Sequence, residues 1–429
     1  MNPAHGEQLA VAVGDLLAHP DDPALPTHQP WWRQSLALGA PGIALLHVEL
    51  AAAGLRPWQR AHRWLAVVTS GPVTTGAASH SFHGAPALAH VLACAAVRHP
   101  GAYAGALDDL DVAIAADARR RVAAAHARID AGVLPALAEF DAIRGLTGIG
   151  AYLLRRPAND QELRAVLEYL VRLTAPLSCD EKVLPGWWAD SGPDGRVDGR
   201  FPGGHGNIGM AHGIGGPLAL LSLAALRGVV VEGQVAAVTT ICDWLDRWRG
   251  ETDAGPIWPY WISRPQLRAG RAPTARAQRP SWCYGTAGLA RAQQLAGIAV
   301  GDPVRRAFAE EALACALSDP HQLAVVTDAS LCHGYAGLAH LAQRAASDAP
   351  PDTTGRLTAL VPRLLNKVGP AGADPHRTAA ALLGDHSRPG LLDGAAGVAL
   401  AALSYGSAAS TGSAWDSCLL SSLSNRPLT

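Results

Sequence analysis

Two strong ligands for transition metals, Cys332 and His333, stand side by side in the stretch SLCHGYAGLAHL at 330–341. A third ligand, Cys283, stands in the similar stretch WCYGTAGLARA at 282–292. Two thiolates and one imidazole are the protein ligands of a zinc site that keeps its fourth position open. The chain contains no CxxC pair, which argues against a zinc finger or ribbon with a closed, structural site. These residue types therefore indicate a catalytic or substrate-binding zinc site.

The two cysteines occupy equivalent positions of an internal repeat. The pattern Gly-x-x-Gly, followed by a stretch rich in Ala and Leu, occurs seven times, with Ala87 replacing the second glycine in one copy. Cys283 and Cys332 each stand two residues before the first glycine of consecutive copies. In a closed ring of repeats, equivalent positions face the same central space, so these thiols can approach each other. The first glycines are Gly39, Gly84, Gly145, Gly213, Gly285, Gly334 and Gly394.

The same register selects a candidate acid or base. His212 stands directly before its glycine, as His333 does, but has no cysteine beside it. Because imidazole titrates near neutral pH, a histidine facing the cavity without binding the metal is suited to proton transfer. The spacing of Asp141 before its glycine predicts a helix cap or a solvated carboxylate. Arg279 either neutralises an anion at the rim of the site or pairs with a surface carboxylate.

Two classes of helix alternate along the chain and must position these residues. The stretches that follow the glycines, such as GGPLALLSLAAL at 215–226, are apolar on nearly all sides and predict buried helices. The segments between them, such as 160–176, have one polar face and predict half-exposed helices. Successive glycine motifs are about 45 to 72 residues apart, which is room for two helices and their connections at about 1.5 Å per residue.

We therefore predict an all-α protein built as a double-layered α/α toroid, with seven buried inner helices and seven amphipathic outer ones. A linear solenoid is the alternative arrangement of the same pairs. Residues 1–429 are expected to form a single domain. The stretches 177–206 and 251–282 are rich in Gly, Pro and Asp or Trp and break the pattern. We expect irregular loops or short strands there, near the active site.

The composition is that of a soluble globular protein, with 49% hydrophobic and 17% charged residues in 429 and a net charge of −1. The balance gives no reason to expect nucleic acid as a partner. The N-terminus lacks the charged region of a signal peptide, and Glu49 and Arg227 interrupt the longest apolar stretches. Seven irregularly spaced cysteines do not suggest a disulfide framework, so a reduced, cytoplasmic protein is expected.

Several motifs in order along the chain resemble those of one family, the LanC lanthipeptide cyclases. The resemblance covers nearly the whole chain, and Ala87 and Trp188 are its mild departures. The residues that carry it are DAIRGLTGIG at 141–150, VLPGWW at 183–188, GNIGMAHGIGGP at 206–217, RPSWCYG at 279–285, CHGYAG at 332–337 and LLDGAAG at 391–397.

This resemblance implies a seven-fold, double-layered α toroid and a set of site residues. The zinc ligands would be Cys283, Cys332 and His333, and His212 with Asp141 would act as the acid–base pair. Arg279 would lie in the active site and stabilise developing negative charge. Tyr284 and Trp282, which flank the first cysteine, would contact the substrate.

The implied function is that of a zinc-dependent cyclase for a class I lanthipeptide precursor, which adds Cys thiolates to dehydroalanine or dehydrobutyrine and forms thioether rings. Its partners would be the dehydrated precursor peptide and a separate dehydratase, because 429 residues hold only the ring. An exporter would be a further member of a membrane-associated complex. The alternatives are a related protein that adds or binds glutathione, and a non-catalytic scaffold with structural zinc. A toroidal glycosidase would need paired carboxylates, whereas the ring positions offer only Asp393.

Overall fold

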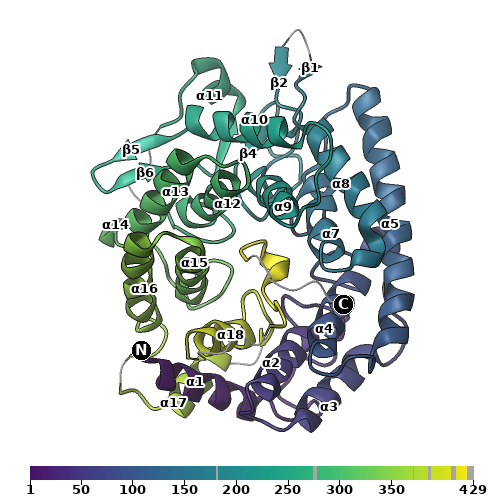
Figure 1. Cartoon of the computed structure of the whole chain (residues 1–429), viewed down its shortest axis with the longest axis vertical. Helices are drawn as coiled ribbons and strands as arrows, with labels where there is room; N and C mark the ends of the chain where they lie inside the picture. Colours follow the sequence, from purple (N-terminus) through teal and green to yellow (C-terminus); the bar gives the residue numbers. More distant parts are fainter. Residues whose placement is uncertain (180–181, 274–277, 371, 385–387, 407–411, 423–429) are drawn as a thin grey trace. The chain divides into compact units, whose positions relative to one another are not determined.

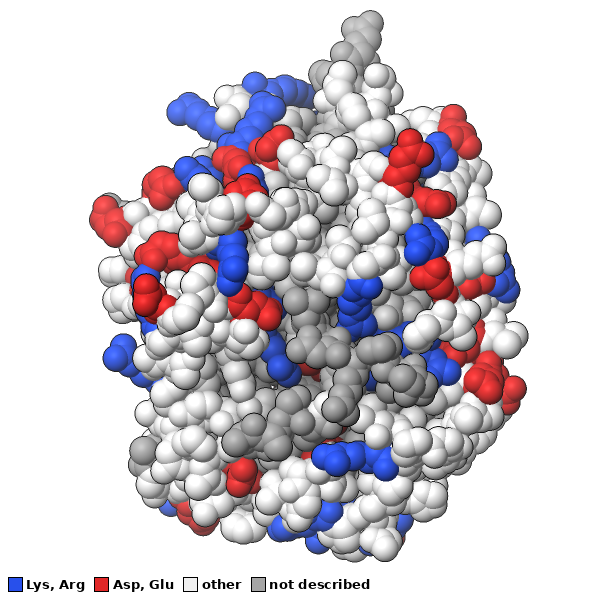
Figure 2. All heavy atoms as spheres, viewed as in Figure 1, with Lys and Arg blue, Asp and Glu red and all other residues white. Residues whose placement is uncertain are grey.

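A computed structural model describes residues 1–179, 182–273, 278–370, 372–384, 388–406 and 412–422 of the chain. The described residues are mostly helical, with a few strands of two or three residues. None of these helices combines the length with the hydropathy that a bilayer-spanning segment requires. Figure 2 shows acidic and basic side chains interspersed over one face of the molecule, in keeping with the nearly neutral net charge.

Each of the seven glycine motifs leads into a buried helix, as the sequence predicts. Most residues of these helices are buried; in α9, all ten residues from Gly215 to Ala224 are. A helix made of Ala, Leu and Gly on all sides can be surrounded by other helices without burying charge. The seven helices are α2 (Ala40–Ala52), α4 (Ala85–Ala96), α7 (Leu146–Leu153), α9 (Gly215–Leu226), α12 (Thr286–Ala299), α15 (Tyr335–Asp348) and α18 (Ala395–Gly406).

The second glycine of the motif allows a close approach of two backbone segments. The Gly337 amide donates to the Ser330 carbonyl at 3.1 Å, and a Cβ at Gly337 would lie 2.0 Å from the Leu331 oxygen. Gly288 repeats both features with Ser281 and Trp282, the corresponding distances being 3.0 and 2.1 Å. No side chain larger than hydrogen fits at either position without moving backbone. The repeated glycine therefore holds the preceding loop, with its cysteine, against the start of the helix.

The amphipathic segments form a second class of helix. In α8, Leu163, Val166, Leu167 and Leu170 are buried, whereas the Arg164 side chain is 42% exposed. This spacing gives the helix one apolar stripe that is buried, and most of its charged side chains lie on the other face. The helices between the buried ones are α1 (Pro3–Leu16), α3 (Trp58–Thr69), α5 (Ala104–Asp130), α8 (Asp160–Leu173), α10 (Gln234–Arg247), α13 (Pro303–Ala316) and α16 (Pro351–Leu365).

Backbone contacts group the described chain into two compact units, each with its own helix pairs. The first unit holds residues 1–114 and 326–416. In it α2 packs on α3, α15 on α16, and α18 on both α1 and α17 (Pro375–Leu383). The buried helices α15, α18, α2 and α4 contact one another in that order. The expectation of a single domain over 1–429 stays a prediction.

The second unit holds residues 115–325 and the segment that begins at Ser417. In it α7 packs on α8, α9 on α10, and α12 on α13, a pair that Figure 1 shows side by side. The buried helices α7, α9 and α12 contact one another in order. Shorter elements complete the described chain: α6 (Leu137–Phe140), α11 (Arg264–Ala269), α14 (Pro320–Ala324), η1 (Gly76–Ala78), η2 (Pro157–Asn159) and η3 (Ser417–Leu419).

The described parts of the stretches 177–206 and 251–282, with the residues next to them, form the strands of the second unit and contain no long helix. Residues 180–181 and 274–277 of these stretches lie outside the described residues. One three-stranded antiparallel sheet has the order β3 (Trp188–Ala189), β4 (His205–Asn207), β7 (Trp261–Ser263). Two hairpins pair β1 (Leu177–Cys179) with β2 (Lys182–Leu184), and β5 (Gly250–Thr252) with β6 (Gly255–Ile257). The sheet matters for function because β4 leads directly into the loop that carries His212.

Candidate metal centre and acid–base pair

The turn before α12 presents Cys283. The Ser281 hydroxyl, which is fully buried, closes this turn by donating to the Tyr284 carbonyl at 2.6 Å and accepting from the Tyr284 amide at 3.2 Å. The same hydroxyl oxygen lies 3.4 Å from the Cys283 sulfur, and the cysteine is 7% exposed. Because the serine holds both flanks of the turn, the thiol has a defined direction before any metal binds.

The corresponding loop before α15 presents Cys332 and His333. The Cys332 amide donates to the Leu392 carbonyl at 3.0 Å, and the His333 amide donates to the Ser330 hydroxyl at 3.2 Å. These bonds hold the backbone of both adjacent residues, so their side chains can point to one place despite being neighbours in sequence. Adjacent ligands are possible here because the residues lie in a turn. In a helix, neighbouring side chains would point in different directions.

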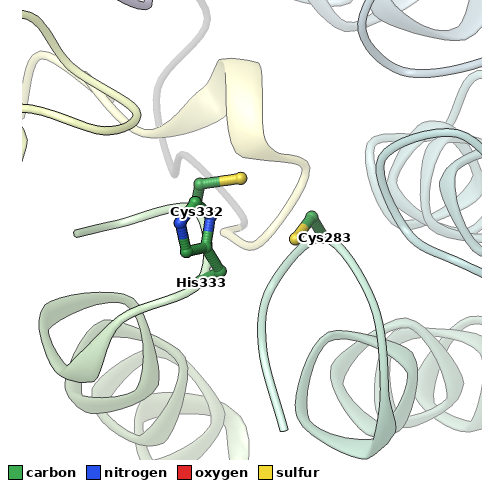
Figure 3. A group of neighbouring side chains, drawn as sticks. All are labelled: Cys283, Cys332 and His333. Carbon is green, nitrogen blue, oxygen red and sulfur yellow. The ribbon is translucent and has the colours of Figure 1, made fainter. Parts of the chain in front are cut away.

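One ligand atom from each of Cys283, Cys332 and His333 lies within 4.8 Å of the others. Figure 3 shows these three side chains. Atoms bound to one zinc ion at about 2.0 to 2.3 Å would lie roughly 3.5 to 3.8 Å apart in tetrahedral geometry, so small side-chain movements bring all three to the ion. Among the described residues, this is the group of ligand side chains close enough to hold a metal. The donor set fits zinc because thiolate and imidazole nitrogen are its preferred ligands.

Two carboxylates lie beside the histidine of this cluster. The Asp328 carboxylate is 3.3 Å from His333 Nε2, and the Asp393 carboxylate is 3.7 Å from His333 Nδ1. A histidine that binds a metal through one nitrogen commonly donates its other N–H to a carboxylate, which orients the ring. Either aspartate is placed for that role. The glycine register includes Asp393, but no sequence pattern singles out Asp328.

His212 and Asp141 form the second functional group of the site. The His212 Nδ1–H donates to Asp141 Oδ2 at 2.6 Å, a charge-assisted contact over 71 residues of sequence. The carboxylate is 1% exposed, whereas the imidazole side chain is 36% exposed. A buried carboxylate on Nδ1 fixes the ring and its tautomer and directs Nε2 toward solvent or substrate. The pairing expected from the resemblance is therefore present as a contact.

The other oxygen of Asp141 explains why this aspartate is so well held. Its Oδ1 accepts backbone N–H groups of Ile143, Arg144 and Gly145 at 3.1, 2.6 and 2.8 Å. These bonds close the loop before α7, which begins at Leu146 with Gly145 as its N-cap residue, so Asp141 does not cap the helix itself. They leave Oδ2 available for His212.

Backbone bonds tie the acid–base pair to the turn that carries the first cysteine. The Ala211 amide donates to the Cys283 carbonyl at 3.2 Å, and the Ala142 amide donates to the Ala211 carbonyl at 3.0 Å. The residues that neighbour His212 and Asp141 are therefore fastened to each other and to the metal-binding turn within one unit. This is the physical reason that three separate motifs contribute to one site.

A buried polar chain orients Tyr284, and no sequence pattern singles out this chain of side chains. The Asn207 side-chain oxygen accepts the Gly209 N–H at 3.0 Å, which defines the direction of the amide. Its nitrogen then donates to the Tyr284 hydroxyl at 3.1 Å and to His205 Nε2 at 3.3 Å. His205 Nδ1–H in turn donates to the Ser191 carbonyl at 2.8 Å. Asn207 and His205 are fully buried, and each has hydrogen-bond partners within this polar chain.

Burial favours the neutral form of the histidine in this polar chain. Burial lowers the pKa of His205, although the bond to the Ser191 carbonyl acts in the opposite direction. The neutral ring can accept from Asn207 at Nε2 only because its proton is on Nδ1. The signal for Asn207 was present in the stretch GNIGMAHGIGGP, where it stands two residues after His205 and five before His212.

Tyr284 lies beside His212, and Tyr260 links Tyr284 to Arg279. The Tyr284 ring is 6.3 Å from the His212 ring, measured between centroids, and 5.5 Å from the ring of Tyr260. The Tyr260 hydroxyl donates to the Arg279 carbonyl at 3.1 Å. The Nε of Arg279 is buried and has no hydrogen-bond partner among the described residues. A buried N–H of this kind is placed to receive an anionic or carbonyl oxygen.

Trp282 occupies a different environment from the one expected for a substrate contact. Its side chain is 2% exposed, and its indole N–H donates to the Leu419 carbonyl at 2.8 Å. The cause is local: when neighbouring residues in a tight turn point in different directions, one of them faces the interior. We therefore assign Trp282 a structural role and leave it out of the proposed substrate contacts.

Buried helices entered through Gly-x-x-Gly turns, together with a cluster of two cysteines and one histidine, define the class of this protein. The chain belongs to the Lanthionine synthetase C-like protein family, which it matches over residues 30–420. A curated relative is the nisin biosynthesis protein NisC of Lactococcus lactis subsp. lactis, 24% identical over 203 residues. The match spans 47% of this chain and 47% of the relative, so the chain covers about half the length of that protein.

A solved structure, that of nisin cyclase, has the same fold. The superposition has a TM-score of 0.76 with 21% sequence identity and covers 95% of this chain and 96% of the other. The predicted fold class, an all-helical α/α toroid, is thereby confirmed. The match excludes the linear solenoid that the repeat pattern left open.

Proposed function

We propose that the protein is a zinc-dependent cyclase that forms lanthionine and methyllanthionine rings in a dehydrated peptide of the class I lanthipeptide type. The observation that carries the proposal is the convergence of the ligand atoms of Cys283, Cys332 and His333 to within 4.8 Å. Family membership and the fold of nisin cyclase support it. A cluster with three protein ligands leaves a position for a substrate thiol, which a four-ligand structural site would not.

Zinc held by these three residues would lower the pKa of a substrate thiol and so supply a thiolate at neutral pH. The reaction to be accounted for is then the addition of a thiol across a carbon–carbon double bond. The sulfur joins the β-carbon of the dehydro residue, and the thiol proton ends on the α-carbon. No net proton enters or leaves, so one acid–base group can serve both stages.

His212 is that group in this proposal. Its Nδ1 is committed to Asp141, so Nε2 carries the proton between the substrate thiol and the α-carbon. The buried carboxylate stabilises the imidazolium that exists between the two transfers. The half-exposed ring can reach a substrate, whereas the buried Asp141 cannot. This division of roles follows from burial.

Arg279 and Tyr284 supply hydrogen-bond donors for the oxygen that becomes negative during addition. Adding the thiolate to the β-carbon shifts charge to the carbonyl oxygen of the dehydro residue. A buried Arg279 Nε–H without a protein acceptor among the described residues stabilises that oxygen better than a solvated group does. Tyr284 is held in place through Asn207 and lies beside the His212 ring.

The substrate proposed is a peptide with Cys and with dehydroalanine or dehydrobutyrine derived from Ser and Thr. The dehydro residues arise by loss of water from Ser and Thr, and we propose a separate dehydratase as the partner that makes them, with an exporter in the same membrane-associated complex. We place the protein in the cytoplasm, where its thiols stay reduced.

The direct test incubates the zinc-loaded protein with a synthetic peptide that contains one dehydroalanine and one cysteine. Ring closure leaves the mass unchanged, so the product is counted as peptide that resists thiol alkylation in mass spectrometry. We expect alkylation to be lost with zinc and retained after chelation. A parallel sample receives glutathione and a dehydroalanine peptide without cysteine. Glutathione addition in that sample without cyclisation in the first would overturn the proposal in favour of a glutathione-adding protein.

A further inference from the structure

The segment 417–422 runs through the interior of the second unit. It begins with η3, which packs on α7, and continues through Leu420 and Ser421, which are 1% and 0% exposed. A segment without a long helix or strand is normally found at the surface, because its backbone polar groups need partners. The partners here are side chains of the second unit, and they lead to the metal-binding turn.

Three hydrogen bonds fasten this segment. Arg155 Nη1 donates to the Ser417 hydroxyl at 3.0 Å. Trp282 Nε1 donates to the Leu419 carbonyl at 2.8 Å, and Arg291 Nε donates to the Ser421 carbonyl at 2.8 Å. Each of the three donors is buried. Two of them, Trp282 and Arg291, belong to the turn and helix that carry Cys283.

Arg291 is a buried charged residue that needs a hydrogen-bond acceptor from the 417–422 segment. Its side chain is fully buried in the interior of α12, where an isolated guanidinium would be costly. It also hydrogen-bonds Gln294, whose amide nitrogen donates to Glu310 at 2.8 Å. The Ser421 carbonyl is thus one of the acceptors that satisfy a buried charge. Loss of the segment would leave this charge and the Trp282 N–H without those acceptors.

We propose that the 417–422 segment is a strut for the metal-binding turn and that Trp282 is a positioning residue. Trp282 directly precedes Cys283, so a fixed indole ring fixes the backbone from which the thiol projects. Arg291, in the second turn of α12, holds the far end of the segment through the Ser421 carbonyl. The inference rests on the metal site of the proposed function and names residues that hold it without touching metal or substrate.

The test compares two tryptophans that make the same bond in the same unit. Trp282→Phe removes the N–H that donates to Leu419. Trp258→Phe removes the N–H that donates to the Leu245 carbonyl at 2.9 Å, from a ring that is equally buried. Both variants are expected to lower the denaturant midpoint by similar amounts. Titration with Zn²⁺ against a chromophoric chelator should show metal affinity lowered at least tenfold in Trp282→Phe and changed less than twofold in Trp258→Phe.

A milder variant acts on the segment itself. Ser417→Ala removes the anchor to Arg155 and should lower Zn²⁺ affinity about two- to fivefold, whereas Ser222→Ala, which removes a buried hydroxyl on α9, should not. The strut proposal would be overturned if Trp282→Phe and Ser417→Ala bound Zn²⁺ as tightly as the unaltered protein. Equal losses of Zn²⁺ affinity in their controls would also overturn it. If the unaltered protein binds no Zn²⁺, the proposed function fails instead. The two failures are therefore distinguishable.

Discussion

At the scale of single residues, the site depends on which atoms of a side chain are already committed. Asp141 uses Oδ1 to hold three backbone N–H groups and Oδ2 to hold His212. Asn207 uses its oxygen for a backbone amide and its nitrogen for Tyr284. In both cases a backbone contact determines the direction of the functional contact, which is how short polar side chains preorganise a site.

The first prediction concerns the metal ligands. Cys283→Ala and Cys332→Ala are each expected to lose metal and cyclisation together, because two remaining ligands bind zinc far more weakly than three. Metal content after gel filtration and the alkylation assay measure the two losses. Cys242→Ala is the control: burial raises the pKa of the Cys242 thiol to about 12, which keeps it protonated and inert. A metal-free but fully active Cys332→Ala protein would exclude the proposed role.

The second prediction separates the acid–base group from the ligands. His212→Ala should keep stoichiometric zinc and lose about 10²- to 10⁴-fold in kcat, the range for a positioned proton-transfer group. Asp141→Asn should keep the backbone bonds at Oδ1, and hence the fold, while lowering kcat through a misoriented imidazole. Metal analysis beside single-turnover kinetics distinguishes these outcomes. Loss of zinc from His212→Ala would mean that this histidine is a ligand.

At the scale of elements, the Gly-x-x-Gly turn is the device that brings a loop against a helix start. The same backbone contact recurs before α12 and α15, where Gly288 and Gly337 occupy equivalent positions. In these two repeats the packing role of the glycine also has a functional consequence. The loops that precede those two helices carry the cysteines.

The third prediction tests this device. Gly337→Ala would place a Cβ 2.0 Å from the Leu331 oxygen, so the loop before Cys332 must move, at a cost of about 2 to 4 kcal/mol in unfolding free energy. Gly355→Ala is the matched control, since that glycine lies exposed in α16 with nothing near its Cβ position. It should stabilise the protein by about 0.5 to 1 kcal/mol through helix propensity. Equal effects in denaturant titrations would contradict the packing role.

At the scale of the whole molecule, stability should depend on pH through a buried histidine of the first unit. His47 donates from Nε2 to the Leu17 carbonyl at 2.8 Å, and burial lowers its pKa to about 4. The unfolded chain takes up a proton as the pH falls through about 6.5, whereas the folded chain does not until about pH 4. The unfolding free energy therefore decreases by about 3 kcal/mol as the pH is lowered from about 6.5 to about 4.

The fourth prediction follows from that difference. His47→Gln keeps an N–H for Leu17 but does not titrate, so the loss of stability between pH 6.5 and 4 should become smaller. Denaturant midpoints at several pH values measure the slope. His62→Gln, an exposed site on α3, should leave the slope as it is in the unaltered protein. A slope that His47→Gln does not change would show that other groups control the acid response.

Local patterns were sufficient for most of the fold. Seven apolar stretches after glycine pairs predicted α2, α4, α7, α9, α12, α15 and α18, because a helix that is apolar on all sides has only the interior to occupy. The same register placed Cys283 and Cys332 at equivalent positions. These features depend on residues within a few turns of one another, which is the range that a sequence pattern records.

What only the tertiary structure decided is the partner of each side chain. The contact of His212 with Asp141 spans 71 residues, and that of Trp282 with Leu419 spans 137. Spacing alone left Asp141 as a cap, and the resemblance made Trp282 a substrate contact. The contacts of both residues depend on which surface each side chain meets after the helices have packed. The sequence by itself therefore determined the repeat, the fold class and the candidate ligands, whereas packing decided which residues meet in the site and which support it from behind.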